Sequence, residues 1–195
     1  MSSQINIKSI YDSEIKHLID GIKDGNSSYH MFCLSTLNEN IPEARTVVLR
    51  KVKQDPLCIY FNADYRSQKV KELIANNNCT ALFYAQDRRV QLRLRCKAVI
   101  HYQNKLSKDV WKHTALQSRK CYMGPFAPSD MLKEWHPNIP DKYLKTDPDE
   151  EHSEEGYINF AHIELCVAEA DILQLHHDGH IRFLVKGASF SFLSP

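Results

Sequence analysis

Three segments between residues 44 and 93 place cationic and amide side chains within, or directly after, apolar sequence of strand character. They read Ala-Arg-Thr-Val-Val-Leu-Arg at 44–50, Ile-Tyr-Phe-Asn-Ala-Asp-Tyr-Arg-Ser-Gln-Lys at 59–69 and Arg-Arg-Val-Gln-Leu-Arg at 88–93. Withdrawing a cation from water costs several kcal/mol unless a partner neutralises it. The repetition therefore indicates a shared anionic partner, and the phosphate of a bound cofactor is our candidate.

Two of these segments offer donors suited to phosphate. Arg45 and Arg50 flank an apolar run, and a guanidinium presents a planar fork of N–H donors that matches phosphate oxygens. Residues 66–69, Arg-Ser-Gln-Lys, fall at a predicted helix start, where free backbone N–H groups and the helix dipole already favour an anion. Surface cations at strand ends and an ordinary capped helix are the alternative interpretations.

Gln91 opens the polar face of a long predicted strand, 89–102. A side-chain amide both donates and accepts hydrogen bonds, which suits the edge of a heterocycle with alternating carbonyl and N–H groups. A glutamine that simply faces solvent is the alternative. Arg93, Arg95 and Lys97 share this face, and we interpret the last two as a solvated or subunit-facing basic stripe.

No pattern typical of a catalytic or metal site accompanies these residues. His176, His177 and His180 cluster near a predicted hairpin, but further ligands at a defined spacing are not evident, so no metal is predicted. The six cysteines form no CxxC pair, and we interpret them as small hydrophobic residues in a reducing compartment. Without a Ser/His/Asp or Cys/His signature, the catalytic residues stay unassigned.

Composition restricts the partners of this chain. Its 195 residues suffice for one domain with a core, and the net charge of +1 provides no field that would recruit nucleic acid or an anionic membrane. No apolar run approaches the roughly 20 residues that span a bilayer, and residues 1–6 lack a signal pattern. We therefore expect a cytoplasmic protein that binds neither nucleic acid nor membrane.

Short, turn-linked segments of strand character dominate the chain. Residues 89–102 alternate apolar and polar side chains with a period of two, so one face of this strand is predicted to be buried. Further strands are predicted at 29–37, 44–52, 57–63, 79–85, 157–175 (with a break near 169–171) and 181–185. We expect the first three of these to form an antiparallel meander. The pattern predicts a mainly β (α+β) fold, an antiparallel sheet closed into a barrel with flanking helices, and a doubly wound parallel sheet is the weaker alternative.

The helices and one irregular segment complete the pattern. Helices are predicted after Ser9 or Asp12, after Asp64 or Ser67, over residues 105–118 with Ser107 as the cap, and briefly from Ser129 to Trp135. Residues 137–156 contain three prolines and seven acidic residues. Such a composition cannot bury a core, so we predict an exposed acidic loop there.

Taken together, three segments resemble the pyridoxamine 5'-phosphate oxidase family. They are Arg-Thr-Val-Val-Leu-Arg (45–50), Phe-Asn-Ala-Asp-Tyr-Arg-Ser-Gln-Lys-Val-Lys-Glu-Leu (61–73) and Val-Gln-Leu-Arg-Leu-Arg-Cys-Lys-Ala (90–98). Their order and spacing agree with the family over about residues 25–125, with a weaker tail at 157–195. The resemblance implies one FMN-binding split β-barrel domain over residues 1–195, and a homodimer with FMN at the subunit interface.

The resemblance also implies which residues hold the cofactor. Arg45 would reach the flavin phosphate, and Gln68 and Lys69 would bind that phosphate at the helix start. Gln91 would meet the isoalloxazine ring, and Arg182 would reach the flavin across the interface. The implied cofactor-binding residues are Arg45, Thr46, Val47, Val48, Leu49, Arg50, Asn62, Ala63, Gln68, Lys69, Gln91 and Arg182.

The substrate side of the pattern departs from the family. His113, Gln117 and Cys121 stand where the true oxidases have a Tyr, an Arg and a Ser that hold the substrate phosphate. Leu173 replaces an expected tryptophan, and His180 matches one substrate-side position. We therefore expect an FMN-dependent oxidoreductase whose small-molecule substrate is not pyridoxamine phosphate.

Other classes of function stay open. One is a flavin- or haem-binding stress or sensor protein without turnover, which the missing substrate ligands favour. Another is a cofactor-free barrel that serves as a protein-binding scaffold. A deazaflavin in place of FMN is a further alternative, because relatives of this barrel use either.

Overall fold

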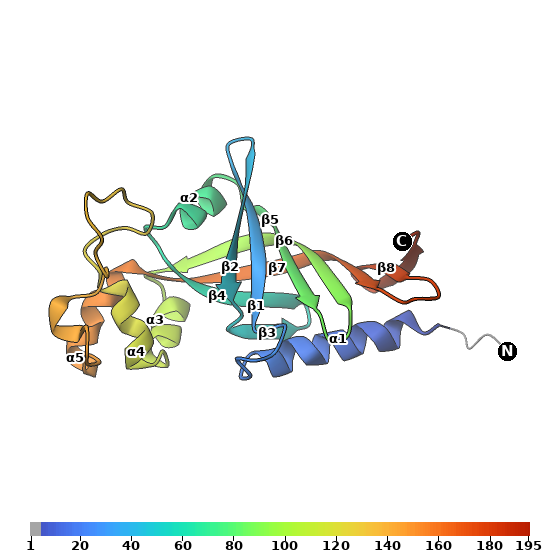
Figure 1. Ribbon diagram of the computed structural model, residues 1–195, viewed down its shortest axis with the longest axis horizontal. Helices are drawn as coiled ribbons and strands as arrows, with labels where there is room; N and C mark the ends of the chain where they lie inside the picture. The colour runs from blue at the N-terminus through green and yellow to red at the C-terminus, as the bar shows by residue number, and fades with distance from the viewer. Residues whose placement is uncertain (1–4) are drawn as a thin grey trace. The chain divides into compact units, whose positions relative to one another are not determined.

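The computed structural model describes residues 5–195 (Figure 1). The strands are β1 (Met31–Asn38), β2 (Ile41–Val48), β3 (Lys51–Gln54), β4 (Leu57–Asp64), β5 (Asn78–Ala85), β6 (Val90–Tyr102), β7 (Phe160–Gln174), β8 (Ile181–Lys186) and β9 (Ser189–Leu193). The α-helices are α1 (Ile7–Gly21), α2 (Gln68–Ala75), α3 (Lys105–Lys112), α4 (Leu116–Arg119) and α5 (Glu150–Ser153). The 3₁₀ helices are η1 (Lys120–Tyr122), η2 (Asp141–Tyr143) and η3 (Glu154–Asn159).

The sequence predicts that residues 1–6 contain no signal pattern and that no segment spans a membrane. Residues 1–4, part of the segment in which the sequence shows no signal pattern, lie outside the described residues. Within the described part, no helix has both the length and the apolar character needed to cross a membrane.

The strands form one sheet in the order β2-β1-β5-β6-β7-β4-β3, with β8 paired to β7 and β9 paired to β8. The registers that the structure describes, such as β1 with β2 and β5 with β6, are antiparallel. The predicted mainly β, antiparallel fold with flanking helices is confirmed. The predicted meander is confirmed in its two antiparallel pairings, β1 with β2 and β3 with β4, but β2 and β3 lie at opposite ends of the strand order, so the three predicted strands do not form a continuous meander.

The chain divides into two compact units. The first unit comprises Met1–Phe61, Asn76–Val99 and Glu164–Pro195, and the second comprises Asn62–Ala75 and Ile100–Ile163. Most of the sheet therefore belongs to the first unit, whereas α2 to α5 belong to the second. The strands β4, β6 and β7 contribute residues to both.

The buried face of β6 organises the core of the first unit. Every second residue from Val90 to Ala98 is at most 5% exposed, as the alternation predicts. Phe32 of β1 packs against Phe83 of β5 and Phe61 of β4, with ring centroids 4.9 and 6.0 Å apart. These aromatic contacts hold together strands that are distant in the sequence, and so fix the strand ends that carry the candidate site.

Two predicted elements of the first unit have different bounds. The helix α1 begins after Asn6, whose side chain accepts a hydrogen bond from the Ser9 amide at 3.1 Å, so the predicted caps are wrong. The predicted strand 44–52 is two strands, because the chain changes its pairing partner at Leu49 and Arg50, between β2 and β3. Their amides donate to the carbonyl oxygens of His30 and Tyr60, each at 2.8 Å.

β7 runs without interruption from Phe160 to Gln174, so the break predicted near residues 169–171 does not form. In the second unit the predicted helix 105–118 is divided into α3 and α4. Asn104 caps α3, and Ser107 is the reciprocal partner in a capping box, with bonds of 2.9 and 3.0 Å. No helix forms from Ser129 to Trp135, a segment that opens with a positive φ of 75° at Ser129.

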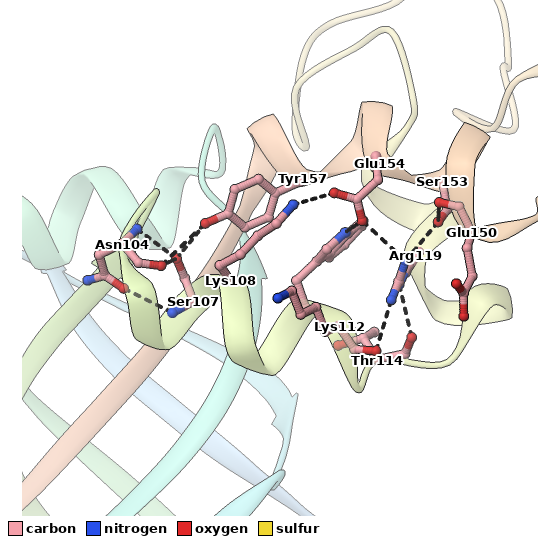
Figure 2. Close-up of polar contacts among 11 residues, drawn as sticks. Asn104, Ser107, Lys108, Lys112, Thr114, Arg119, Glu150, Ser153, Glu154 and Tyr157 are labelled. Atoms are coloured by element: carbon pink, nitrogen blue, oxygen red, sulfur yellow. Dashed lines mark hydrogen bonds and ion pairs between the residues drawn. The ribbon is translucent and has the colours of Figure 1, made fainter.

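The acidic segment 137–156 is exposed at all seven of its acidic residues, as predicted, but it is not a loop. It contains η2, α5 and the start of η3. Figure 2 shows Glu154 between Lys108 of α3 and Arg119 of α4, and its carboxylate also accepts a hydrogen bond from Trp111 Nε1 at 2.8 Å. The composition argument failed because a single acidic side chain is anchored by three donors that lie far away in the sequence.

Candidate cofactor site

The segment 45–50 divides into side chains that face outwards and side chains that are buried. Thr46 and Arg50 are exposed, whereas Val47 and Leu49 are 8% and 0% exposed. Strand alternation explains the division. Val47 and Leu49 therefore cannot offer their side chains to a ligand, and any contact they make with a flavin comes from their backbone atoms.

Arg45 lies half-buried on β2 and bonds to its own unit. Its Nη1 donates to Thr36 Oγ1 on β1, and it lies 3.5 Å from the carbonyl oxygens of Leu34 and Glu43. These contacts fix the direction of the guanidinium along the β1–β2 hairpin. A phosphate that binds Arg45 must share the guanidinium with these acceptors.

Gln91 and Arg45, the cationic residue of β2, are separated by two intervening strands. Thr46 pairs with Cys33 of β1, Cys33 with Leu82 of β5, and Leu82 with Arg93 of β6. Neighbouring strands lie about 4.8 Å apart, so this row spans about 14 Å from Thr46 to Arg93. The register does not bring β2 and β6 into contact, so Arg45 and Gln91 would have to meet different parts of one cofactor.

The start of α2, in the second unit, combines polar groups with different partners. Asp64 binds the Arg66 guanidinium in a two-pronged pair of 3.0 and 2.7 Å. Arg66 also donates to the carbonyl oxygen of Gly124 at 3.0 Å. Gln68 is exposed and Lys69 is half-buried. Arg66 thus shapes the turn before α2, while Gln68 and Lys69 provide donors at the positive end of the helix.

Gly124 is buried where two segments approach each other closely. A Cβ atom at this position would overlap the backbone and the side chain of Asn138. The Asn138 side chain bonds to both the amide and the carbonyl of Phe126, each at 3.0 Å. Because Gly124 has no side chain, Asn138 can pack directly against it. The carbonyl oxygen of Gly124 is the one that accepts the hydrogen bond from Arg66.

Ser67, immediately before α2, is 1% exposed, and its Oγ has no hydrogen-bond partner among the described residues. A buried hydroxyl without a partner costs about 1–3 kcal/mol. In this conformation protein atoms enclose the hydroxyl, so reaching a phosphate at the helix start requires a rotation about its Cα–Cβ bond. An anion bound at this helix start, next to Gln68 and Lys69, would provide the acceptor that the Ser67 hydroxyl lacks among the described residues.

Asn62 and Ala63, the last residues of the predicted set in this unit, end β4. Ala63 is 5% exposed, and the Asn62 side chain lies 2.7 Å from Nδ1 of His162 on β7. His162 is 2% exposed and was not singled out by the sequence pattern. The sequence feature that could have identified His162 is its position between apolar residues of a predicted strand.

Arg182 bonds to a carboxylate within the first unit. Its Nε and Nη2 donate to the two oxygens of Asp171 at 3.0 and 2.9 Å, and Arg93 of β6 donates to the same carboxylate. The hydrogen bonds from Arg182 and Arg93 outweigh burial and hold the pKa of Asp171 below its ordinary value. Asp171 was missed, although an acidic residue within an apolar strand indicates a buried ion pair.

Arg95, a further basic residue of β6, also has a partner. Arg95 bonds to Glu169 at 3.0 Å, and Lys186 of β8 bonds to the same carboxylate at 3.0 Å. The stripe predicted at Arg95 and Lys97 is exposed, in agreement with a solvated face.

The substrate-side candidates lie at exposed positions. His180 is exposed and its Nδ1 accepts a hydrogen bond from the His176 amide at 3.3 Å. His113, Gln117 and Cys121 are exposed as well. Neither set provides a buried cluster of phosphate donors.

Among the described residues, one group of side chains has the geometry of metal ligands, and it does not include the C-terminal histidines. It consists of Cys58 of β4 with Glu164 and Cys166 of β7. No sequence pattern indicates this group, because the two cysteines are 108 positions apart in the chain.

Comparison with known proteins identifies the class to which this architecture belongs. The structure is similar to a pyridoxamine 5'-phosphate oxidase-related, FMN-binding protein from Nostoc punctiforme, with a TM-score of 0.74, 20% sequence identity and coverage of 95% of this chain and 97% of that one. It is also similar to PhzG from Burkholderia lata in complex with tetrahydrophenazine-1-carboxylic acid, with a TM-score of 0.63, 14% identity and coverage of 100% and 94%. At these identities the likeness establishes the fold, which is the split β-barrel of FMN-binding proteins.

The sequence comparison points to one family. Residues 9–102 match the profile of the pyridoxamine 5'-phosphate oxidase FMN-binding domain. No curated protein matches the chain. This part of the chain is therefore similar to the pyridoxamine 5'-phosphate oxidase-like, FMN-binding family, as the three motifs indicated.

Proposed function

We propose that this protein is a cytoplasmic, homodimeric flavoprotein that binds FMN and acts as an oxidoreductase on a small molecule other than pyridoxamine phosphate. The observation that carries the proposal is the start of α2. There Gln68 and Lys69 lie at the positive end of a helix, next to the buried Ser67 hydroxyl, which has no partner in the described part of the chain. The match of residues 9–102 to an FMN-binding domain makes FMN the first candidate for the anion that belongs there.

In this proposal the residues of the chain bind and orient the cofactor. Lys69 and Gln68 hold the phosphate at the helix start, and Arg45 contributes its guanidinium to the same group. Gln91 presents its amide to the ring edge. Bound FMN supplies the redox chemistry, and the protein determines which molecule can reach the ring.

The substrate is proposed to differ from that of the true oxidases because the phosphate-binding residues are replaced. His113, Gln117 and Cys121 are exposed and present no guanidinium to a substrate phosphate. A flavin-binding protein without turnover remains the second candidate, because the same replacements would suit it.

The absorbance spectrum of the freshly purified protein, followed by mass analysis of the released molecule, tests the proposal. We expect the flavin maxima and the mass of FMN. A double variant, Arg45→Ala with Lys69→Ala, should lose the colour, whereas Lys71→Ala, an exposed residue of the same helix, should keep it. Colourless protein that does not load with excess FMN would refute the proposal.

Turnover is tested separately. Photoreduced protein is reoxidised in air and anaerobically, with and without candidate substrates. Acceleration of flavin reoxidation or reduction by a small molecule supports an oxidoreductase, and indifference to every candidate supports the second function.

A further inference from the structure

Two thiols and a carboxylate converge on neighbouring strands of the first unit. Cys58 lies on β4, and Glu164 and Cys166 lie on β7, the next strand of the sheet. Glu164 and Cys166 are two residues apart, so they project from the same face of β7. One ligand atom from each of the three side chains lies within 4.8 Å of the others.

We propose that Cys58, Glu164 and Cys166 form a binding site for a thiophilic divalent cation of the Zn²⁺ class. Zinc lies about 2.3 Å from thiolate sulfur and about 2.0–2.2 Å from carboxylate oxygen, so tetrahedral ligand atoms stand about 3.3–3.8 Å apart. Drawing the three side chains together from 4.8 Å requires displacements of about 1 Å or less at each ligand atom. Side-chain rotation alone supplies such displacements.

Tyr60 positions the carboxylate of this site. It follows Cys58 by two residues on β4 and therefore shares its face, and its hydroxyl donates to Oε1 of Glu164 at 2.7 Å. A hydrogen bond of this kind fixes the direction of a metal-binding carboxylate. Lys51 places its ammonium group 5.2 Å from the centre of the Tyr60 ring, which adds a positive charge near a site with three anionic ligands.

Burial at the site is uneven in a way that suits entry of an ion. Cys58 is 1% exposed, whereas Glu164 and Cys166 are half-buried. An ion can therefore approach from the side of β7 and complete its coordination with Cys58 and a water molecule.

The site is distinct from the proposed flavin contacts, because none of its residues belongs to the set that holds FMN. The preference of the site for a soft metal ion follows from its donor atoms. Two thiolates with one carboxylate select Zn²⁺ over Mg²⁺ or Ca²⁺, which prefer oxygen ligands.

Titration of the full-length, reduced and chelator-treated protein with Co²⁺ tests the site. Difference spectra against cobalt-free protein should show thiolate-to-cobalt charge transfer and the absorption of tetrahedral Co²⁺, saturating at one ion per chain, and Zn²⁺ should displace the signal. Cys58→Ser and Cys166→Ser should each abolish the charge transfer. Cys33→Ser, at a half-buried cysteine of β1 outside the site, should retain it.

Tyr60→Phe distinguishes positioning from packing. Loss of the hydrogen bond to Glu164 should weaken Co²⁺ binding about 10–100-fold while the charge-transfer band persists at saturation. Glu164→Gln should also weaken binding. If reduced protein with all six thiols titratable after denaturation shows no charge transfer, or if the band survives both cysteine substitutions at the site, the proposal is overturned. These readouts do not depend on whether the chain carries FMN.

Discussion

The Asp171 cluster of the first unit and the start of α2 in the second unit differ in how the protein satisfies their polar groups. Asp171 forms ion pairs with Arg182 and Arg93, both of which were candidates for an external anion on sequence grounds alone. At the start of α2, Asp64 holds Arg66, but the Ser67 hydroxyl has no acceptor among the residues that the structure describes. Cationic side chains near a cleft are therefore weak evidence for a ligand until their internal partners are known, and an unsatisfied buried donor is stronger evidence.

Asp171→Asn should have the largest effect on stability. The substitution removes the charge that holds two guanidinium groups, and hydrogen bonds to charged groups contribute about 1.5–3 kcal/mol. Because both arginines are partly exposed, solvent screening reduces this, and we expect a loss of about 1–2 kcal/mol in the free energy of unfolding. Chemical denaturation of the FMN-free protein measures it, and an unchanged midpoint would show that the cluster is energetically neutral.

The loss of stability caused by Asp171→Asn should depend on pH, and this dependence tests the role of the Asp171 charge. Asp171 has a lowered pKa in the folded protein, so its contribution is complete above its unfolded-state pKa of about 3.9 and is lost as the pH falls through the lower folded value. The difference in stability between wild type and Asp171→Asn should thus be constant near neutral pH and vanish in acid. A difference that grows below about pH 4 would contradict the assignment.

Ser67→Ala separates the two regions most sharply. Removing a buried hydroxyl that lacks a partner should leave the FMN-free protein equally stable or more stable. If the hydroxyl turns to the phosphate, the same substitution should weaken FMN binding about tenfold, which corresponds to about 1.4 kcal/mol. Flavin fluorescence titration measures the affinity. Unchanged affinity together with raised stability would mean that the hydroxyl is a packing defect and not part of the site.

Glu154→Gln should have a smaller effect, confined to the second unit. Burial opposes its ionisation, but hydrogen bonds from Lys108 and Trp111 and the charge of Arg119 lower the pKa of Glu154. Glutamine preserves an acceptor for Trp111 and loses the charge that faces Arg119, so we expect a loss of about 1 kcal/mol or less. Thermal unfolding measures it, with Glu155→Gln, an exposed neighbour, as the control. Equal melting temperatures for both variants would show that the anchor is not charge-dependent.

The sequence was informative where a structural property depends on local periodicity. The alternation from Val90 to Ala98 predicted the buried face of β6 because the period of a strand is a property of the backbone. The pairing of β4 was not predictable in this way. Its pairing with β3 is a local hairpin, but its pairing with β7 joins segments that are distant in the chain.

The polar contacts show the same limit. The segment 66–69 was identified because a helix start has an intrinsic affinity for anions. The carboxylates that engage the candidate arginines were not identified, since no local pattern associates Asp171 with both Arg93 and Arg182. The acidic segment 137–156 was predicted to be a loop from its composition. Its helices depend instead on the contacts of Glu154 with Trp111 and Arg119 in the folded protein.

The contact between Gly124 and Asn138 offers a different kind of experimental handle. Any larger residue at position 124 would displace Asn138 and break its hydrogen bonds to Phe126. It would also displace the Gly124 carbonyl oxygen, which accepts a hydrogen bond from Arg66. A Gly124→Ala allele should therefore be conditional, complementing growth in the cold and failing on warming, in any organism whose survival depends on this protein.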